Sequence, residues 1–373
     1  INEKSNEEVK NLNEFKIKNY DDYKYDLINN KTLNNIKELI INELSKKKII
    51  IDVIFDENEL KTGYICDIKS LKVLYKNNTE KIVLKIQNID NELSKVAKKI
   101  NLYTNEEYFY KVIQKSVNTS SPKYFGSIDD NDKIGILLEN INIFNGQFNL
   151  DLNKDIDLIL KIVNDISEMH NNFTFSKKTE VLNDFKLLNK VNEITYYKEL
   201  IQKRFNKFMK INNFVFTEKS KKIITKIHDN FDKIINKSSE FPLNFCHGDL
   251  KSANIFYKKE LNNYSPIYLD WQYIHLNKGI SDIAFLLVES TDFNNITTDI
   301  VLKYYFKKSK MYSDYSNLLF DFKLSLCIFP YFVMLWFNSE NREKLIDKVF
   351  PIRFMKNLLK FYEEYITDDF FNF

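Results

Sequence analysis

Apolar residues near the start of the chain first recur at the three- and four-residue spacing of a helix and then become continuous. The helical stretch begins at Thr32, a candidate N-cap, and its apolar positions are Leu33, Ile36, Leu39, Ile40 and Leu44. Three β-rich segments follow, at 49–55, 64–75 and 81–86, with short polar turns between them. This pattern predicts a helix followed by an antiparallel sheet, whereas residues 1 to about 30 give no clear pattern.

The pattern changes again after two further short strands. A turn at 121–126 and an apolar run at 134–138 predict a fourth and a fifth strand. From about residue 149 the spacing is mostly helical, and 183–213 and 218–236 predict two helices of this region. The chain is therefore expected to be α+β, with a small antiparallel sheet followed by a larger, mostly helical part.

Charge and composition narrow the possible partners. The formal net charge of the 373 residues is only +3, which favours neither nucleic acid nor a membrane as a partner. The longest apolar stretch, 324–337, is shorter than a bilayer crossing and predicts a buried helix. The chain starts without an apolar run behind basic residues, so no secretory signal is expected. Three widely spaced cysteines, Cys66, Cys246 and Cys327, indicate a reducing compartment, and we expect a cytoplasmic protein.

The strongest chemical signal is a segment of the form H-G-D-x-x-x-x-N, which starts at His247 and contains Asp249 and Asn254. Asp270 follows at the end of an apolar run. Phosphoryl transfer from ATP needs a carboxylate for the proton of the attacking hydroxyl, and an amide and a second carboxylate to hold magnesium. Residues 255–268 predict a hairpin that brings Asn254 and Asp270 together. The sequence therefore predicts a kinase that uses ATP and Mg²⁺.

Three motifs together resemble one group of small-molecule kinases. H-G-D-x-x-x-x-N at 247–254, L-D-W-Q at 269–272 and D-I-A-F-L-L at 282–287 are similar to the aminoglycoside phosphotransferase/choline kinase superfamily. The chain is most similar to the ecdysteroid kinase-like branch, in which D-W-Q or D-F-Q is usual. The resemblance implies a bilobal protein kinase-like fold, with an N-lobe at 1–140 that ends in the hinge. A helical C-lobe at 141–373 would carry the catalytic loop and the acceptor pocket.

On the nucleotide side, the resemblance assigns five residues. Lys85 matches the lysine of the third kinase strand, which pairs with the α- and β-phosphates, and Glu106 matches its partner on the following helix. Gly63 lies between the first two strands, where a kinase covers the phosphates with backbone amides. A plain hairpin turn explains Gly63 equally well, because the full G-x-G-x-x-G is absent. Glu139 and Asn140 follow the fifth strand as the hinge, where backbone groups read the adenine edge.

The catalytic side is assigned by the same motifs. Asp249 is the expected base, since in-line attack needs a carboxylate near the acceptor hydroxyl. Asn254 and Asp270 offer the hard oxygen ligands that suit magnesium. Lys251 matches the lysine of H-R-D-L-K-x-x-N in protein kinases, where it would neutralise the γ-phosphate. His247 is expected to orient the loop through hydrogen bonds.

Four further residues receive structural interpretations. Glu107 would point about 100° away from the preceding glutamate on a helix, so the two cannot both pair with the strand lysine. Trp271 stands where protein kinases have the Phe of D-F-G, and its bulk predicts a fixed segment. Asp282 is expected to accept backbone hydrogen bonds from the catalytic loop. His170, at the end of a helical pattern, is expected to make a structural hydrogen bond.

The expected function is transfer of the γ-phosphate of ATP to a hydroxyl of a small molecule. A pseudokinase that binds nucleotide or a partner is one alternative, although Lys85, Asp249, Asn254 and Asp270 are all present. A protein kinase is another, but Asp282 follows too soon for a long activation segment, and no A-P-E motif occurs. Neither the identity of the acceptor nor the oligomeric state can be read from the sequence.

Overall fold

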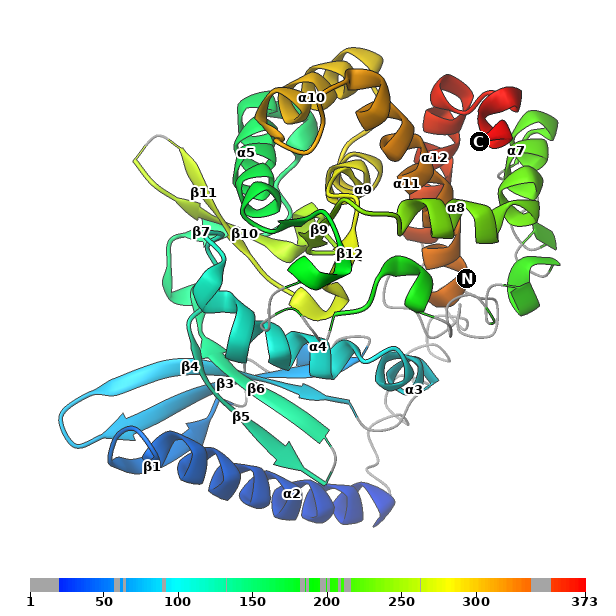
Figure 1. The fold of residues 1–373 in the computed structure, drawn as a ribbon. Helices are drawn as coiled ribbons and strands as arrows, with labels where there is room; N and C mark the ends of the chain where they lie inside the picture. The colour runs from blue at the N-terminus through cyan, green and yellow to red at the C-terminus, as the bar shows by residue number, and fades with distance from the viewer. Residues whose placement is uncertain are drawn as a thin grey trace, which may run out of the picture.

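The chain folds into two lobes, a lower one built on a sheet and an upper one that is mostly helical (Figure 1). The computed structural model describes residues 20–56, 61–62, 65–88, 92–131, 133–181, 185, 188–194, 199, 202–206, 209–210, 216–261, 263–336 and 350–373. The predicted α+β, bilobal protein kinase-like architecture is confirmed. The boundary between residues 140 and 141 stays a prediction.

The sheet of the lower lobe has the strand order β1-β3-β4-β6-β5, and the short β2 pairs with β3. All of these pairs are antiparallel. In β4 the buried Ile82, Leu84 and Ile86 alternate with Lys85, whose side chain therefore points to the opposite face. The strand bounds are β1 Ile50–Phe55, β2 Lys61–Thr62, β3 Cys66–Tyr75, β4 Thr79–Gln87, β5 Tyr124–Asp130 and β6 Lys133–Glu139.

One face of this sheet is covered by helix α2, Tyr20–Ser45, which lies beneath it in Figure 1. Ile36, Ile40 and Leu44 of the helix are buried in a cluster with apolar residues of the sheet. The helix begins at Tyr20, so the prediction of an N-cap at Thr32 is wrong. No glycine or proline separates these two residues, and the polar sequence there weakens the apolar pattern without ending the helix.

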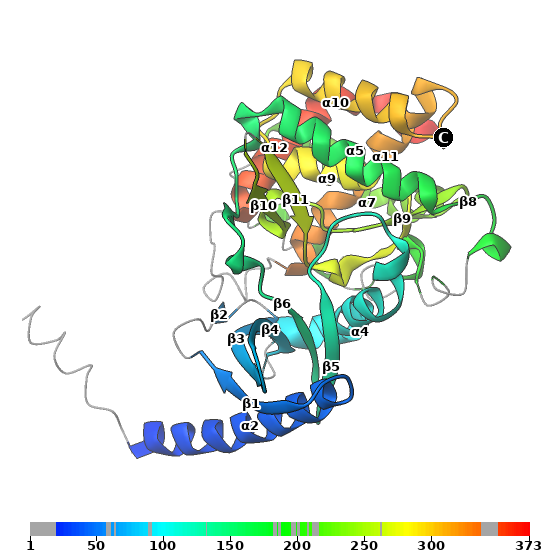
Figure 2. The same cartoon turned by 90° about the vertical axis from the view of Figure 1, so that its left-hand side faces the viewer.

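Two short helices, α3 (Glu92–Lys99) and α4 (Leu102–Tyr108), lie between the sheet and the upper lobe (Figure 1, Figure 2). Asn101 joins them in the left-handed conformation, with a φ of 61°. A π-helix, Phe109–Ile113, continues α4. It places Phe109 in the hydrophobic core of the upper lobe, so one core extends across both lobes.

The upper lobe consists mainly of helices. The predicted helix at 218–236 is two helices, α7 and α8, because Asn230 departs from helical geometry with a ψ of 11°. The prediction of one helix from residue 183 to 213 is wrong in its first part, where Lys190 is extended and bridges Leu276. Apolar spacing alone does not separate a helix from a packed irregular segment. The bounds are α5 Ile156–Asn172, α7 Glu218–Asp229, α8 Phe231–Ser238, α9 Ile280–Ser290, α10 Asn295–Lys308, α11 Tyr315–Trp336 and α12 Phe350–Tyr365.

The apolar stretch at 324–337 falls largely within α11, as predicted for a buried helix. Leu324, Leu326 and Cys327 are fully buried. Among the residues that the structure describes, no helix is both long and apolar enough to cross a membrane.

Two small antiparallel sheets of the upper lobe frame the predicted catalytic loop. β10 and β11 form the predicted hairpin, with Ile255 opposite Tyr268, and β7 pairs with β10. The backbone N–H of Leu269 donates to the carbonyl of Asn254 at 2.9 Å, which brings Asn254 beside the end of β11. β9 lies between β8 and β12. The bounds are β7 Gly146–Gln147, β8 Thr174–Phe175, β9 Leu243–Cys246, β10 Ile255–Lys259, β11 Tyr264–Tyr268 and β12 His275–Asn277.

Candidate active site

Lys85 of β4 forms ion pairs with two carboxylates from different parts of the chain. Its Nζ lies 2.8 Å from Oε2 of Glu106 on α4, and it also donates to Oδ1 of Asp270, which follows β11. Burial would lower the pKa of Lys85, but the charges of Asp270 and Glu106 outweigh it and raise this pKa well above its usual value. Lys85 is therefore a fixed cation that joins the sheet to the upper lobe.

The two adjacent glutamates of α4 have different neighbours, as helical geometry predicts. Glu106 is buried beside Lys85, and its burial raises its pKa above the usual value although the charge of the lysine opposes this change. Glu107 instead accepts a hydrogen bond from Ser127 at 2.6 Å and lies 3.7 Å from Nζ of Lys111. Of the two, the structure pairs only Glu106 with Lys85.

The loop after β9 surrounds Asp249 with hydrogen-bond donors. Nζ of Lys251 donates to both carboxylate oxygens of Asp249, at 3.0 and 2.9 Å, and the Asn254 amide donates to Oδ2 at 2.9 Å. Burial raises the pKa of Asp249 to about 6, while Lys251 limits the rise. Burial alone would lower the pKa of Lys251, but the charges of Asp249 and Glu289 raise it. At neutral pH the loop therefore holds an ionised carboxylate beside a permanent cation.

Asn254 and Asp270 keep oxygen atoms available for a ligand. The side-chain nitrogen of Asn254 donates to Asp249, so its Oδ1 points elsewhere. In the described part of the chain, no protein group donates a hydrogen bond to Oδ1 of Asn254 or Oδ2 of Asp270. Amide and carboxylate oxygens are ligands that Mg²⁺ prefers, so these two residues fit the predicted metal.

The backbone of Asp270 is held in an uncommon conformation. Its φ of 65° and ψ of 53° lie in the left-handed region, which costs a residue other than glycine on the order of 1–2 kcal/mol. Burial would raise the pKa of this carboxyl, but the charge and hydrogen bond of Lys85 lower it. Asp270 is thus kept ionised and turned toward Lys85 by its surroundings, and such local strain concentrates at functional sites.

Asp282 of α9 holds the predicted catalytic loop through the backbone N–H groups of that loop, as expected from the sequence. Its carboxylate accepts hydrogen bonds from the N–H groups of His247, at 2.8 Å, and Gly248, at 2.9 Å. Gly248 has a φ of 81°, and a Cβ atom there would lie 2.1 Å from the carbonyl oxygen of Tyr273. Only glycine fits this position, which explains the glycine of the H-G-D motif.

His247 orients the same loop through its ring. Its Nε2 donates to the carbonyl of Leu269 at 2.9 Å, and its Nδ1 accepts the backbone N–H of Asp249 at 3.2 Å. Burial lowers the pKa of His247, and a neutral ring with its proton on Nε2 satisfies both contacts. Both nitrogens are engaged, which agrees with the orienting role predicted for His247.

Trp271 follows Asp270 and is completely buried between aromatic rings. Its ring stacks on Phe109 with the centroids 3.9 Å apart, and the His247 ring lies 4.5 Å away. Its Nε1 donates to the carbonyl of Tyr268 at 3.1 Å. These contacts hold the segment in one position and agree with the prediction that it is fixed.

A second group of possible metal ligands is buried beneath the loop. Ligand atoms of His170, Cys246 and Asp282 lie within 4.8 Å of one another. Nδ1 of His170 is hydrogen-bonded to the Tyr305 hydroxyl at 2.9 Å, and Nε2 lies 3.2 Å from Asp282. Because the ring nitrogens and the carboxylate oxygens are already used, this group is structural, and His170 makes the structural hydrogen bonds predicted for it.

Sequence comparison places these features in a known family. The model of the family DUF1679, described as "Uncharacterized oxidoreductase dhs-27", matches residues 56–335, well over half of the chain. The chain belongs to this family. DUF1679 is the ecdysteroid kinase-like branch, so the resemblance drawn from the three motifs is confirmed. That description names another protein and assigns no activity to this chain.

Individual relatives are distant from this DUF1679 protein. The Protein LicA homolog of Mycoplasma capricolum is 24% identical over 222 residues, which cover 56% of this chain and 84% of that protein. A putative fructosamine-3-kinase structure from Haemophilus somnus is 12% identical and covers 89% of this chain and 97% of its own, with a TM-score of 0.46. A microcompartment-associated aminopropanol kinase is 11% identical and covers 89% and 98%, with a TM-score of 0.48. The family assignment rests on the family model and not on these pairs.

The remaining residues predicted on the nucleotide side of this DUF1679 site are only partly described. Gly63 lies outside the described residues. The N–H of Glu139 donates to the carbonyl of Lys123 at 2.9 Å, so this group is not free to read adenine. The Asn140 side chain is buried and donates to the Ser70 hydroxyl at 3.1 Å. The hinge assignment of both residues stays a prediction, restricted to their other backbone groups.

One carboxylate beside the loop was missed by the sequence analysis. Glu289 is buried on α9, accepts a hydrogen bond from the Ser290 hydroxyl at 2.6 Å and lies 3.1 Å from Nη2 of Arg353. The Ser290 hydroxyl oxygen in turn accepts a hydrogen bond from the backbone N–H of Ser252, in the predicted catalytic loop, at 2.8 Å. Glu289 lies two helical turns after Asp282 on the same face of the helix, and this spacing is the sequence signal that could have identified it.

Proposed function

We propose that this DUF1679 protein is an ATP- and Mg²⁺-dependent phosphotransferase that moves the γ-phosphate to a hydroxyl of a small molecule. The kinase-like fold supports the class of enzyme. The observation that carries the proposal is the pairing of Lys85 with both Glu106 and Asp270. It aligns a phosphate-binding cation from one lobe with a metal-binding carboxylate from the other, as phosphoryl transfer requires.

In this proposal Lys85 binds the α- and β-phosphates, and Glu106 keeps its ammonium group in place. Asn254 and Asp270 hold the magnesium through the two oxygen atoms that no described protein group occupies. When bound, the metal neutralises phosphate charge. The protein supplies a preformed arrangement of charges, and little of it has to move before the reaction.

Asp249 would accept the proton of the attacking hydroxyl. A pKa of about 6 leaves it mostly ionised at neutral pH and close enough to neutrality to be an effective base. Lys251 holds this carboxylate from one side and carries a charge that would face the γ-phosphate, as its motif implies. His247 and Asp282 position the loop and are not in the path of the proton.

A small acceptor is favoured over a peptide by the segment after Asp270. The structure describes every residue from Trp271 to Asp282, and β12 and the start of α9 occupy this stretch. No long activation segment is inserted between Trp271 and Asp282, and protein kinases use such a segment to bind peptides. The acceptor is therefore proposed to be a small hydroxylated molecule that binds beside Asp249.

The first test is nucleotide binding. ATP with magnesium should raise the melting temperature more than ATP with a chelator, because a ligand that binds only the folded state stabilises it. Asp270→Ala should remove the magnesium-dependent part of the shift while the protein remains folded. Equal shifts with and without magnesium in the wild type would contradict the metal assignment.

The second test is turnover. ATP consumption should be screened over a panel of hydroxylated metabolites, and one or more should raise it above the rate with water alone. A nucleotide-binding pseudokinase is the alternative that one observation favours, since Lys251 already occupies both oxygens of Asp249. Magnesium-dependent ATP binding without acceptor-stimulated consumption across the panel would support that alternative.

A further inference from the structure

Helix α9 holds the predicted catalytic loop at two points, one on either side of Asp249. Near the start of the helix, the Asp282 carboxylate accepts hydrogen bonds from the backbone N–H groups of the two residues that precede Asp249. At the last residue of the helix, the Ser290 hydroxyl oxygen accepts one from the backbone N–H of Ser252 at 2.8 Å. Because α9 is an unbroken helix between these two contacts, it sets the distance between the two sides of the loop.

Glu289 fixes the direction of the Ser290 hydroxyl. The hydroxyl donates to Oε2 of Glu289 at 2.6 Å, so its oxygen lone pairs remain to accept the N–H of Ser252. Glu289 is buried, and a hydrogen bond to a carboxylate is stronger than one between neutral groups. Without this acceptor the hydroxyl could rotate, and its lone pairs would no longer be held toward the loop.

Helix α12 holds Glu289 from the other side. Nη1 of Arg353 donates to the backbone carbonyl of Glu289 at 2.9 Å, and Nη2 donates to Oε1 of its side chain at 3.1 Å. One helical turn further along α12, the buried Asn357 amide donates to the carbonyls of Val288 and Thr291, each at 2.7 Å. The last carbonyls of a helix have no partner inside it. Helix α12 therefore caps the end of α9 that holds the loop.

Glu289 also acts on the loop through its charge. Burial would lower the pKa of Lys251, but the charges of Asp249 and Glu289 raise it. Lys251 donates to both carboxylate oxygens of Asp249, whereas in the described part of the chain Glu289 makes no hydrogen bond or ion pair to Asp249. The influence of Glu289 on Asp249 therefore passes through the residues between them in the loop.

We propose that Glu289 is a positioning residue for the predicted catalytic loop. Through the Ser290 hydroxyl, it fixes the peptide bond that joins Lys251 to Ser252. The N–H that Ser290 holds belongs to this peptide bond, so its position determines where the backbone of Lys251 lies, and the lysine is kept beside Asp249. The role of Glu289 in turnover rests on the phosphotransferase function proposed above, whereas its effect on the geometry of the loop does not.

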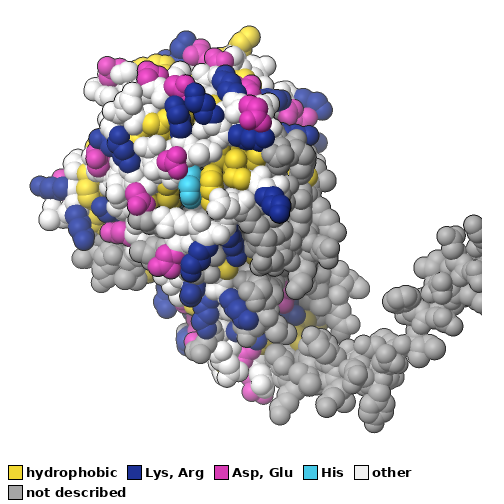
Figure 3. Space-filling view, turned by 90° about the vertical axis from the view of Figure 1, so that its right-hand side faces the viewer, with side chains coloured by type: hydrophobic (Ala, Val, Ile, Leu, Met, Phe, Trp, Pro, Cys, Tyr) yellow, Lys and Arg dark blue, Asp and Glu magenta, His cyan; other side chains and the backbone are white. Residues whose placement is uncertain are grey.

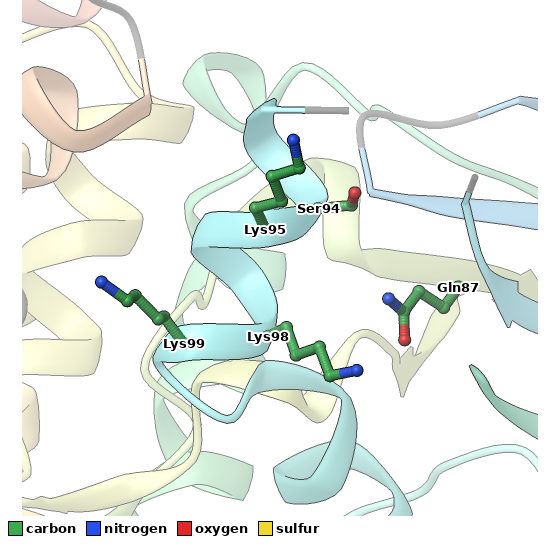
Figure 4. A pocket seen from close by; sticks show the side chains of 5 residues that line it. All are labelled: Gln87, Ser94, Lys95, Lys98 and Lys99. Carbon is green, nitrogen blue, oxygen red and sulfur yellow. The ribbon is translucent and has the colours of Figure 1, made fainter. Parts of the chain in front are cut away.

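Two other features of the molecule are separate from these contacts. Side chains of both charges are interspersed over the upper lobe on the side where α12 lies (Figure 3), so the loss of one exposed charge there is a small change for the lobe. A pocket beside α3 is lined by residues of β4 and of that helix (Figure 4). Neither Glu289 nor Ser290 lines it, and the effects of changing them can therefore be assigned to the loop.

The first measurement is amide hydrogen exchange in the full chain without ligand, followed by NMR. In Ser290→Ala the Ser252 amide should exchange faster by about tenfold or more, the equivalent of one lost hydrogen bond. Glu289→Ala should accelerate the same amide to a similar extent. The two amides held by Asp282 should stay protected in both variants. An unchanged exchange rate at Ser252 in Glu289→Ala would overturn the proposal.

The second measurement is steady-state turnover with an acceptor found by screening. Ser290→Ala and Glu289→Ala should each lower kcat by about tenfold or more, because a small displacement of a reacting group is costly. KM for ATP should stay within about threefold of the wild type, since Lys85 is unchanged. The double variant should lose no more than the weaker single variant, because the two residues act in one path. Ser290→Thr, which retains the hydroxyl, should recover most of the turnover lost in Ser290→Ala.

The matched control is Glu363→Ala, which removes an exposed glutamate from α12. It should leave exchange and turnover within about twofold of the wild type, as expected for a surface substitution. Ser290→Ala guards against misfolding, because it removes only the hydroxyl of a half-buried side chain. Losses that multiply in the double variant, or a raised KM for ATP with unchanged kcat, would overturn the role in turnover. No turnover in the wild type would contradict the proposed function, and the exchange rates would still decide whether Glu289 positions the loop.

Discussion

Asp270 and Asp282 are two aspartates of the same site with opposite surroundings. The Asp282 side chain is 1% exposed, and its carboxylate receives two backbone N–H groups and faces the ring of His170. The Asp270 side chain is 26% exposed and contacts Lys85 through one oxygen only. Asp282 thus belongs to a closed cluster with His170, and Asp270 to an open cluster with Lys85.

The difference separates a structural carboxylate from one that is prepared for a ligand. A buried polar network whose members are all satisfied is rigid and has no capacity for a further partner. A carboxylate that is ionised, locally strained and only half satisfied retains that capacity. We therefore expect changes in the closed cluster to affect stability first, and changes in the open cluster and around Asp249 to affect ligand binding and turnover first.

The largest effect is expected at Asp249. Asp249→Asn should lower turnover by a factor on the order of 10² to 10⁴, the usual contribution of a general base. Its affinity for nucleotide should stay nearly unchanged, because the base acts on the acceptor. The measurement is kcat with an acceptor found by screening, together with a thermal shift for ATP and magnesium.

Lys85→Ala is the matched comparison for this variant. It should weaken nucleotide binding and turnover together, since its charge contacts the phosphates in both the ground and the transition state. Equal rates of ATP consumption in the wild type and Asp249→Asn would show that the H-G-D motif is not catalytic.

A large loss of stability is expected in the closed cluster. Asp282→Asn places an amide N–H₂ where a carboxylate oxygen accepts a backbone N–H, so at least one buried donor loses its partner. The free energy of unfolding should fall on the order of 2–4 kcal/mol, as expected when buried hydrogen bonds to a charged group are broken. Chemical denaturation measures this change. A variant of wild-type stability with reduced nucleotide binding would assign Asp282 to the open cluster instead.

A smaller effect distinguishes the two glutamates of α4. Glu106→Gln removes the charge that holds Lys85, and nucleotide affinity should fall by roughly tenfold, the equivalent of about 1.4 kcal/mol. Glu107→Gln changes a neighbouring residue that contacts Ser127 and should leave affinity within about twofold of the wild type. Titration of ATP with magnesium into both variants compares them directly. A greater loss in Glu107→Gln would reverse the assignment.

The smallest expected effect is on acid stability. Burial would raise the pKa of Asp282, but its contacts with His170 and the N–H of Gly248 lower it below the usual value of 3.8. The stabilisation from this carboxylate is therefore complete above about pH 4 and is lost as the pH falls further. Between pH 5 and 3, unfolding free energy should fall more steeply in the wild type than in Asp282→Asn. Parallel curves would show that another group controls this range.

Much of this site could be predicted because its chemistry requires particular residues at short spacings. Asp249, Asn254 and Asp270 were found from one motif and a hairpin, and the structure joins them as that hairpin requires. Glu106 could be chosen over Glu107 because helical geometry permits only one of them to face a given strand residue. Motif spacing and helical geometry were sufficient wherever the interacting residues are close in sequence or belong to the same helix or hairpin.

The rest depends on contacts between distant parts of the chain. The start of α2 at Tyr20 could not be read from a polar stretch, and the break at Asn230 is one residue in a continuous apolar pattern. The backbone N–H of Glu139 is occupied by a hydrogen bond to the carbonyl of Lys123, which is distant in sequence.

Trp271 has a practical consequence, because it is one of only two tryptophans in the chain. Its indole lies against Phe109, in the core that both lobes share, so its fluorescence should respond whenever the lobes separate. A core shared in this way makes the two lobes a single cooperative unit. Fluorescence and circular dichroism should then report the same unfolding midpoint, and a fragment restricted to residues 141–373 should expose the indole and fail to fold by itself.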